Sequence, residues 1–478
     1  MTYTPTAVPL CVDLDGTLVR TNTLIEAVLL VIRRRPLVLP RMLWWARRGQ
    51  GHLWHRLAAI GVPDARSLPY APEVVALVSA EAKRRPLVLV TGAHRTIAEG
   101  VAGHLGLFRE VLASDGDEHL VGERKARALT DRFGQAGFDY VGDSSADLAV
   151  WRRARHAYLV SAATTLAEQV RSFGVGLEVL EGAPREPAWR AIVRAMRPAQ
   201  WGKNALVLVP ALLAHRVTEP AVLGAALIAT LAFCITSSSV YILNDLLDVE
   251  ADRRHPTKSK RPIASGSLSL RGAILLWAVL LGGAVAMLLA LSPIAALLLI
   301  GYVVTTTAYT FWLKEKLAID MVVLASFYVQ RLFVGAAATG IHLSFWTLLF
   351  SLLVFMGLAA VKRYSEVHNR EIDGIADSSR RAYVGGDKHV LQAIGTSCFT
   401  GALIAVGLYL GSDDVTRLYR RPELLWALAP VFLAWTSRLW LLSARGKLRD
   451  EDPVAFALRD RWTWAAAVIV GAIFVAAV

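Results

Sequence analysis

Cysteine and charged residues are scarce in this chain. Only 3 of its 478 residues are cysteines, and Cys11, Cys234 and Cys398 match no CxxC spacing, so a disulfide framework and a structural zinc site have little support. Charged residues make up 19% and hydrophobic residues 55%, whereas an average soluble domain is about a quarter charged. This composition argues against a single water-soluble globule.

A secretory signal and an excess of acidic residues are also missing. Residues 1–16 contain no basic region followed by an apolar stretch, so we expect no cleavable signal peptide. Lysine and arginine number 52 against 39 acidic residues, which gives a formal charge of +13 at pH 7. In a chain this apolar, the excess indicates cytoplasmic loops of a membrane protein rather than a nucleic-acid groove.

Hydropathy changes near residue 200 and divides the chain into two parts. We expect residues 1–180 to form a Rossmann-like α/β domain, because short apolar runs alternate with charged helical stretches. The runs at residues 9–12, 86–90 and 138–141 predict buried parallel strands. Between the first two runs, residues 22–85 predict a small helical cap.

Residues 203–478 predict an all-α membrane domain, since a segment of about 20 apolar residues crosses a bilayer core. About nine segments fit, the first being short and weak: 203–218, 221–243, 271–292, 293–313, 317–340, 344–366, 390–411, 425–444 and 462–478. Lysine and arginine cluster after the second, fourth, sixth and eighth segments. This pattern predicts a multi-pass protein of the cytoplasmic (inner) membrane, with the N-terminal domain and these loops on the cytoplasmic side.

Residues 181–202 link the two parts and predict a helix lying in the membrane interface. Four apolar residues among arginines follow the spacing of one helical face: Trp189, Ile192, Val193 and Met196. Packing of this helix on protein is the alternative. The cap offers a similar choice, because its basic stretch at residues 33–48, with Trp44 and Trp45, suits either anionic lipid headgroups or solvent.

Four short motifs in the N-terminal part carry acidic, hydroxyl and amine groups, and three of them lie at the ends of predicted strands. They are CVDLDGT with Asp13 and Asp15, LVLVTGA with Thr91, GERK with Lys125, and VGDSSAD with Asp143 and Asp147. Because residues i and i+2 of a strand face alike, Asp13 and Asp15 lie on one side. Two such carboxylates can divide nucleophile and acid/base roles around a phosphoryl group, with Mg²⁺ screening their repulsion.

In this order the motifs resemble those of the haloacid-dehalogenase (HAD) superfamily of phosphatases and phosphomutases, over residues 8–175. The resemblance implies these roles: Asp13 as the phosphorylated nucleophile, Asp15 as the general acid/base, Thr91 and Gly92 as phosphate-binding residues, Lys125 as the charge-neutralising lysine, Asp13, Asp15 and Asp143 as Mg²⁺ ligands, and Asp147 as a supporting acidic residue. A catalytically silent domain kept for docking is the alternative, although no catalytic position is substituted.

The sequence NDLLDVEAD lies at the cytoplasmic end of the second predicted span. Four of its side chains lie toward one helical face: Asn244, Asp245, Asp248 and Asp252. Mg²⁺ ions bridging them to a diphosphate would offset the mutual repulsion of the carboxylates, and we expect Asp245 and Asp248 to be essential for catalysis. The next segment, RRHPTKSKRPIASG, is a cationic loop whose Lys258 and Arg261 can bind further phosphate oxygens.

The pattern NDxxDxxxD followed by HPTKxxRPIASG resembles the UbiA superfamily of intramembrane prenyltransferases, over about residues 195–478. The resemblance implies Mg²⁺ as the cofactor. It also implies supporting roles for other polar residues: Lys203, Asn204, Lys314, Asp320 and Arg331. An arginine as deep as Arg331 normally faces a polar cavity, and a purely structural role for it is the alternative.

Most members of this superfamily carry a second carboxylate cluster at the end of the sixth span, and this chain departs from that pattern. The sequence there is VKRYSE, which offers three candidate substrate-binding residues: Lys362, Arg363 and Glu366. Asp373 and Asp377 follow only in a predicted loop. This version resembles the polyprenyl-phosphate phosphoribosyltransferases of the superfamily, which serve cell-wall synthesis. Their donor is phosphoribosyl pyrophosphate (PRPP) and their acceptor is polyprenyl phosphate, so Lys362 and Arg363 would bind phosphate groups.

We therefore predict a bifunctional membrane enzyme. Its membrane domain would transfer 5-phosphoribose from PRPP to polyprenyl phosphate with release of diphosphate, and its HAD domain would remove the 5-phosphate from the lipid product. One alternative is prenyl transfer from a prenyl diphosphate to an aromatic or lipid acceptor, with the HAD domain acting on an unrelated phosphate. Another is a non-enzymatic transporter or scaffold. The expected partners are the substrates and the lipid bilayer, with no nucleic acid, and homo-oligomerisation is left open.

Overall fold

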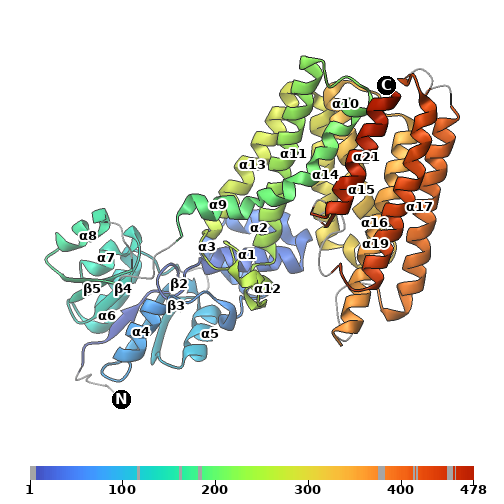
Figure 1. Cartoon of the computed structure of the whole chain (residues 1–478). Coiled ribbons are helices and arrows are strands. Elements are labelled where there is room, and N and C mark those ends of the chain that lie inside the picture. The colour runs from blue at the N-terminus through green and yellow to red at the C-terminus, as the bar shows by residue number, and fades with distance from the viewer. Residues whose placement is uncertain are drawn as a thin grey trace. The chain divides into compact units, whose positions relative to one another are not determined.

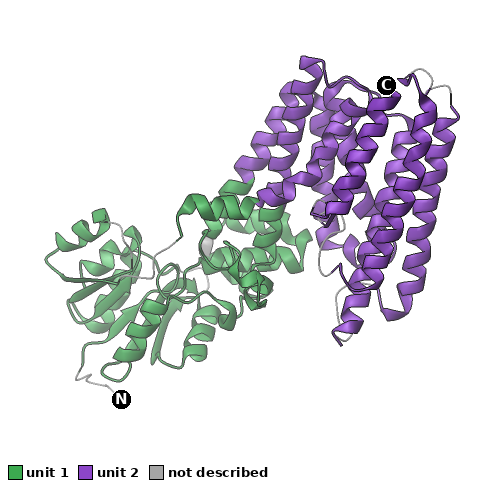
Figure 2. Ribbon diagram, viewed as in Figure 1, with its two compact units in different colours: residues 1–196, 241–277 green, residues 197–240, 278–478 purple. Residues whose placement is uncertain are grey.

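The computed structural model describes residues 7–115, 119–160, 164–180, 186–374, 383–412, 415, 418–448, 456–457 and 459–478. The chain forms two compact units, residues 1–196 with 241–277 and residues 197–240 with 278–478 (Figure 2). The first unit therefore contains, besides the N-terminal part, the NDLLDVEAD motif and the cationic loop that follows it.

A six-stranded parallel sheet forms the centre of the first unit (Figure 1). Its strands are β1 (Leu10–Val12), β2 (Leu87–His94), β3 (Glu110–Ser114), β4 (Asp139–Gly142), β5 (His156–Leu159) and β6 (Gly176–Val179), in the spatial order β3-β2-β1-β4-β5-β6. The three predicted strands are confirmed as β1, β2 and β4. Leu10 and Val12 enter one apolar cluster and Cys11 enters another, because a parallel sheet buries both faces.

Helices between the strands supply these two apolar clusters. On the side of Leu10 and Val12 lie α4 (Pro72–Glu81) and α5 (Arg95–Leu105). On the side of Cys11 lie α6 (Glu123–Phe133), α7 (Leu148–Trp151) and α8 (Thr164–Arg171). The predicted Rossmann-like α/β fold is confirmed.

The predicted helical cap is formed between β1 and β2. It consists of α1 (Thr23–Arg34), α2 (Leu39–Ala46) and α3 (Gln50–Ala58), with 3-10 turns at Pro36–Val38 and Ala65–Ser67. Asn22 caps α1, because its side chain accepts a hydrogen bond from the Ile25 amide at 3.1 Å. In the basic stretch, Leu43 and Trp44 are exposed, and contact of this surface with lipid headgroups stays a prediction.

Three shorter elements complete the first unit: α9 (Ala188–Met196), α12 (Val249–Arg254) and a 3-10 turn at Lys258–Lys260. Helix α9 lies in the predicted linker. It buries Ala191 and Ala195 but leaves Trp189 and Val193 exposed. Part of the predicted apolar face is thus uncovered, and its position in the membrane interface stays a prediction.

The second unit is helical, as predicted. Its main elements are a 3-10 helix at Pro198–Leu208, α10 (Val209–Leu213), α11 (Pro220–Leu247), α13 (Leu270–Leu291), α14 (Pro293–Phe311), α15 (Ile319–Thr339), α16 (Phe345–Ile372), α17 (Lys388–Leu410), α19 (Leu428–Ala444) and α21 (Arg461–Ala477). The parts of α11 and α13 that lie within residues 241–277 belong to the first unit. Shorter 3-10 turns occur at Leu313–Glu315, Gly385–Asp387 and Pro422–Ala427.

The prediction of nine spans was approximate. Among the described residues, seven helices are long and apolar enough to cross a membrane, and Arg461–Ala477 is a shorter apolar helix. The first predicted span, 203–218, is divided between a 3-10 helix and α10. Pro210 interrupts the hydrogen-bond ladder there. The backbone is also tightly packed, since a Cβ added at Gly335 would lie 2.0 Å from the Val207 carbonyl oxygen.

Candidate active sites

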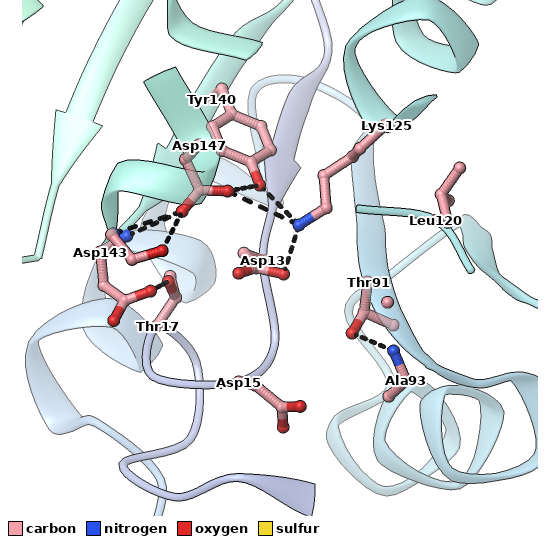
Figure 3. A network of polar contacts seen from close by, with 12 residues as sticks. Asp13, Asp15, Thr17, Thr91, Ala93, Leu120, Lys125, Tyr140, Asp143 and Asp147 are labelled. Carbon is pink, nitrogen blue, oxygen red and sulfur yellow. Dashed lines mark hydrogen bonds and ion pairs between the residues drawn. The ribbon is translucent and has the colours of Figure 1, made fainter. Parts of the chain in front are cut away.

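The first site lies at the carboxyl ends of β1, β2 and β4. Because the carboxyl ends of parallel strands meet at one edge of a sheet, the residues of separate motifs come together there. Figure 3 shows the carboxylates of Asp143 and Asp147 to one side of Asp13 and the amine of Lys125 to the other, with Thr91 on a neighbouring strand. The structure thus brings the four predicted HAD motifs into one constellation.

Lys125 is the closest polar partner of the predicted nucleophile. Its Nζ donates to Asp13 Oδ1 at 2.8 Å and to Tyr140 Oη at 3.0 Å, and it lies 3.6 Å from Asp147 Oδ1. Asp13 and Lys125 are both buried. Burial raises the pKa of the Asp13 carboxyl, and the ammonium of Lys125 opposes that shift. The lysine therefore favours the ionised, nucleophilic form of Asp13.

Asp15 points away from this pair and toward the cap (Figure 3). It accepts hydrogen bonds from the Thr23 amide at 2.9 Å and from Thr23 Oγ1 at 3.1 Å, at the first residue of α1. Burial raises the pKa of Asp15 to about 6, although the bonds from Thr23 lower it. A carboxyl that titrates near neutral pH suits a general acid/base.

A metal ion could be held by a carboxylate cluster beside Asp13. Oxygen atoms of Asp13, Asp143 and Asp147 lie within 4.8 Å of one another. Asp15, which the sequence analysis included among the ligands, directs its carboxylate to Thr23 instead, and Asp147 is the third member of the cluster. The three carboxylates supply oxygen donors, which suit Mg²⁺. Burial raises the pKa of Asp143 to about 6.

Asp143 is held at this place by residues of the first motif. Thr17 Oγ1 donates to Asp143 Oδ1 at 3.2 Å. Gly16 has a φ of 84°, and a Cβ there would lie 2.3 Å from Asp143 Oδ2. Only glycine fits this position, because a side chain would both strain the backbone and displace the carboxylate.

The remaining residues support the constellation. Thr91 is buried and its Oγ1 accepts from the Ala93 amide at 3.0 Å, while the Gly92 carbonyl accepts from Ser114 Oγ at 2.9 Å. Phosphate binding by Thr91 and Gly92 stays a prediction. Asp147 accepts from Tyr140 Oη at 2.8 Å. Tyr140 was not predicted as a site residue, although it lies three residues before Asp143 on a buried strand.

The second site begins with the acidic motif in the first unit. Helix α11 ends at Leu247 and α12 begins at Val249, but the Asp248 amide still donates to Asn244 O at 2.9 Å and the Asp252 amide to Asp248 O at 2.8 Å. The predicted common face therefore persists across the break. Asp248 is partly exposed, whereas Asp245 and Asp252 are buried.

Arg261 of the cationic loop bridges two of these carboxylates. Its Nη1 lies 3.1 Å from Asp245 Oδ1 and 2.6 Å from Asp252 Oδ2. Burial raises the pKa of Asp252, and Arg261 opposes the shift. Lys258 is exposed on the same loop. The loop and the acidic face thus contact each other within one unit, and their binding of a diphosphate stays a prediction.

In the second unit, Arg331 lies in an aromatic cage. Its guanidinium carbon is 4.8 Å from the Phe233 ring centre, 5.5 Å from that of Tyr302 and 5.3 Å from that of Tyr328. Its Nε donates to Asn204 Oδ1 at 3.0 Å and its Nη1 to the Phe327 carbonyl. Arg331 and Asn204 are thus brought together, and cation–π contacts stabilise the buried charge.

Arg363 is fully engaged by protein groups. It donates from Nε to Asp320 Oδ2 at 2.6 Å, from Nη1 to Glu366 Oε2 at 2.7 Å, and from Nη2 to Tyr309 Oη at 2.8 Å. Tyr383 Oη donates to the other oxygen of Asp320 at 2.5 Å. Because each nitrogen of Arg363 has a protein partner, its predicted binding of phosphate would require an exchange of partners.

Four other positions of the second unit were considered in the sequence analysis. Lys203 and Lys362 are both partly buried. Asp373 ends α16, and Asp377 lies outside the described residues. The roles of these residues stay predictions.

The second unit also contains an apolar cavity of about 900 Å³. Residues of several helices line it, among them Leu206, Leu332, Phe350, Phe432, Trp435 and Val470. Its volume lies near the upper end of the range for small-molecule pockets, about 300–1,000 Å³. An apolar cavity of this size suits a hydrocarbon ligand.

Comparison with protein families agrees with both resemblances. The model of the UbiA prenyltransferase family matches residues 205–464, more than half of the chain. The chain belongs to the UbiA prenyltransferase family. The haloacid dehalogenase-like hydrolase model matches residues 10–152. Both descriptions name enzymes, and seven helices among the described residues could span a membrane, so this UbiA member is a multi-pass membrane enzyme with a HAD domain.

Three relatives show how far the similarity extends. The uncharacterized protein y4nM of Sinorhizobium fredii is 32% identical over 474 residues, which are 98% of this chain and 91% of the relative. Decaprenyl-phosphate phosphoribosyltransferase of Mycobacterium tuberculosis is 36% identical over 231 residues, 47% of this chain and 74% of the relative. Nodulation protein NoeC of Azorhizobium caulinodans is 32% identical over 275 residues, 56% of this chain and 86% of the relative.

Proposed function

We propose that this UbiA member transfers 5-phosphoribose from PRPP to polyprenyl phosphate and then removes the 5-phosphate from the lipid product in its HAD domain. One observation carries the proposal. The assembled phosphatase constellation folds in the same compact unit as the acidic motif and the cationic loop of the transferase. The similarity to a decaprenyl-phosphate phosphoribosyltransferase supports the choice of donor and acceptor.

The acidic face fits a metal–diphosphate complex. Asp245 and Asp252 converge on one arginine, so the pair already accommodates a cation between its carboxylates. Together with Asn244 and Asp248 these residues would hold Mg²⁺, which would neutralise charge on the departing diphosphate. In this arrangement Lys258 and Arg261 bind diphosphate oxygens and fix their orientation.

The transfer reaction itself needs little acid/base help. An oxygen of the lipid phosphate attacks C1 of the ribose while the bond from C1 to the diphosphate breaks, and the electron pair leaves with diphosphate. A phosphate monoester is already anionic at neutral pH, so no general base is required. The enzyme then contributes positioning and charge stabilisation.

The phosphatase step uses the constellation of Figure 3. Asp13 attacks the phosphorus of the 5-phosphate, and the ribose oxygen leaves with a proton from Asp15. Water then attacks the aspartyl phosphate, with Asp15 taking its proton, and inorganic phosphate is released. Lys125 binds Asp13 and balances negative charge. Asp13, Asp143 and Asp147 would hold Mg²⁺, which would stabilise the phosphoryl oxygens.

Both proposed reactions would take place on the same side of the membrane. The lysine- and arginine-rich connections predict that the HAD domain and the active-site loops are cytoplasmic in a protein of the inner membrane. PRPP is a soluble anion, so a cytoplasmic site would receive it directly from solution.

The experiment that tests this function uses labelled PRPP and a polyprenyl phosphate with membranes containing the protein. The parent should form polyprenyl-phosphoryl-ribose and release diphosphate and phosphate, as followed by mass analysis of the lipid. The variant Asp13→Asn should accumulate polyprenyl-phosphoryl-5-phosphoribose. An identical lipid product from parent and variant would show that the HAD domain acts on an unrelated phosphate.

Prenyl transfer from a prenyl diphosphate to an aromatic or lipid acceptor is the second candidate. The acidic face suits the diphosphate group of a prenyl diphosphate as well. Donor dependence separates the two candidates, because only phosphoribosyl transfer consumes PRPP. Product formation with a prenyl diphosphate and none with PRPP would favour this second reaction.

A further inference from the structure

Two ion pairs connect the HAD cap with the acidic motif inside the first unit. The more buried pair joins Glu26 of α1 to Arg253 of α12, whose side chains are 3% and 7% exposed. Arg253 binds Glu26 through both terminal nitrogens, at 2.8 and 2.9 Å, and its Nε donates to the Ala264 carbonyl at 3.1 Å. A forked contact of this kind fixes direction as well as distance, so α1 has a defined position against the loop.

The second pair lies two helical turns further along α1. Arg33 follows Glu26 by seven residues, and residues at i and i+7 share a helical face. Its Nε lies 3.0 Å from Asp248 Oδ1. The side chains of Arg33 and Asp248 are 17% and 35% exposed. The buried pair thus holds α1 so that Arg33 reaches the acidic motif.

Arg33 contacts a residue that the proposed function assigns to Mg²⁺–diphosphate binding. Two cations cannot share one side of a carboxylate without repulsion, so Arg33 and a metal ion compete for Asp248. A guanidinium released from Asp248 next to a bound diphosphate finds phosphate oxygens, which arginine binds well. The partly exposed pair can exchange partners easily because water screens it.

We propose that Arg33 is a diphosphate-binding residue of the transferase site, supplied by the phosphatase cap and positioned by the Glu26–Arg253 pair. The proposal rests on the proposed function, in which the acidic face binds a diphosphate. It assigns a part of the transferase site to a segment of the chain that precedes the residues matching the UbiA family, 205–464.

The test uses full-length protein in lipid nanodiscs, with Asp143→Asn in every variant so that the phosphatase metal site is silent. Arg33→Gln is compared with Arg34→Gln, an exposed neighbour on the same helix. Calorimetry measures Mg²⁺ binding alone and then inorganic diphosphate binding at saturating Mg²⁺. Both are equilibrium readouts that do not depend on turnover.

The proposal predicts opposite effects on the two ligands. Arg33→Gln should bind Mg²⁺ about twofold to fivefold more tightly, because a competing exposed ion pair is removed. It should bind Mg²⁺–diphosphate roughly tenfold more weakly or worse, because a charge-assisted hydrogen bond is lost. Arg34→Gln should change neither affinity. In assays with PRPP, Arg33→Gln should raise KM more than it lowers kcat.

A merely structural ion pair would give a different result. If Arg33→Gln weakens Mg²⁺ and diphosphate binding equally, or matches Arg34→Gln, the proposal is wrong. If the parent binds Mg²⁺–diphosphate but transfers nothing from PRPP, the proposed donor is wrong. The proposed role of Arg33 is then still tested by the Mg²⁺ and diphosphate affinities of Arg33→Gln. A parent that binds no Mg²⁺–diphosphate would overturn both.

The positioning role of the buried pair is tested by Glu26→Gln, which keeps the side-chain shape. It should weaken diphosphate binding in the same direction as Arg33→Gln. The double variant Glu26→Gln/Arg33→Gln should bind no more weakly than Arg33→Gln alone, since both changes remove one interaction. Additive losses would show that Glu26 does not act through Arg33.

Discussion

Replacing Lys125 by methionine removes the ammonium group that contacts Asp13 while keeping a long, unbranched side chain. In the parent, Nζ lies 2.8 Å from Asp13 Oδ1 and 3.6 Å from Asp147 Oδ1, and the lysine is 4% exposed. The substitution leaves two carboxylates without this cation and Tyr140 Oη without one of its partners. Its largest effect should fall on the chemical step, where negative charge accumulates.

The geometry sets the size of the effect. Opposite charges 2.8 Å apart interact by roughly 6 kcal/mol at an effective dielectric constant of about 20. Much of this is offset by the desolvation of a buried lysine. Loss of one preorganised electrostatic group in an active site typically lowers kcat by about 10²–10³, or about 2.7–4 kcal/mol. We therefore expect hydrolysis to slow by about that factor.

The assay is hydrolysis of para-nitrophenyl phosphate at saturating Mg²⁺, with phosphoribosyl transfer measured in the same preparation. Arg124→Met is the matched control, because Arg124 is the exposed neighbour of Lys125 on α6. Lys125→Met should lose hydrolysis and keep transfer, and Arg124→Met should keep both. A Lys125→Met protein that hydrolyses at the parent rate would refute the assigned role of the lysine.

Three further predictions concern the two sites and the ion pair between α1 and α12. Asp245→Ala should abolish Mg²⁺-dependent transfer, measured with labelled PRPP, and leave hydrolysis of para-nitrophenyl phosphate unchanged; loss of both activities would contradict separate sites. Arg253→Met should destabilise the first unit by about 3–5 kcal/mol, because it leaves Glu26 buried without its cation, and faster hydrogen exchange of the α1 amides would report this; unchanged exchange would refute it. Burial raises the pKa of Asp15 and of Asp143 to about 6 from 3.8, so their contribution to stability is complete below about pH 3.8 and is lost as the pH rises through about 6. In the presence of a chelator, the melting temperature should therefore fall as the pH rises through about 6. Added Mg²⁺ should restore the melting temperature by binding ionised Asp143. A melting temperature that does not depend on Mg²⁺ would count against the metal site.

The positions of the phosphatase residues could be predicted from sequence because they follow strands. Once residues 9–12, 86–90 and 138–141 are recognised as parallel strands, Asp13, Thr91 and Asp143 must meet at one edge of the sheet. The direction of Asp15 could not be predicted in this way. It depends on Thr23 at the start of α1, and only the cap's fold brings that amide to the carboxylate.

The membrane part shows the same limit. Hydropathy predicts the positions of long apolar helices. It does not predict the close packing of the Val207 backbone against Gly335, or the division of residues 198–213 into two short helices. The four-residue spacing of the acidic motif correctly placed its carboxylates on one face. The partner of Asp248 could not be predicted, since Arg33 is 215 residues away and no local pattern relates the two.

The attachment of α1 constrains how the phosphatase can work. A cap that swings open as a lid would have to move α1, but the N-terminal residue of α1 binds Asp15 and its Glu26 is held by the buried contact with Arg253. Breaking such a pair costs about 3–5 kcal/mol, which would slow each turnover by more than a hundredfold if it were the rate-limiting opening step. We therefore expect substrate to enter with α1 in place. In the proposed function the substrate is a lipid-linked phosphate, whose reacting group extends from a membrane anchor and can reach a fixed site of this kind. A short linker between the two parts of the chain would keep its effective concentration at this site in the millimolar range.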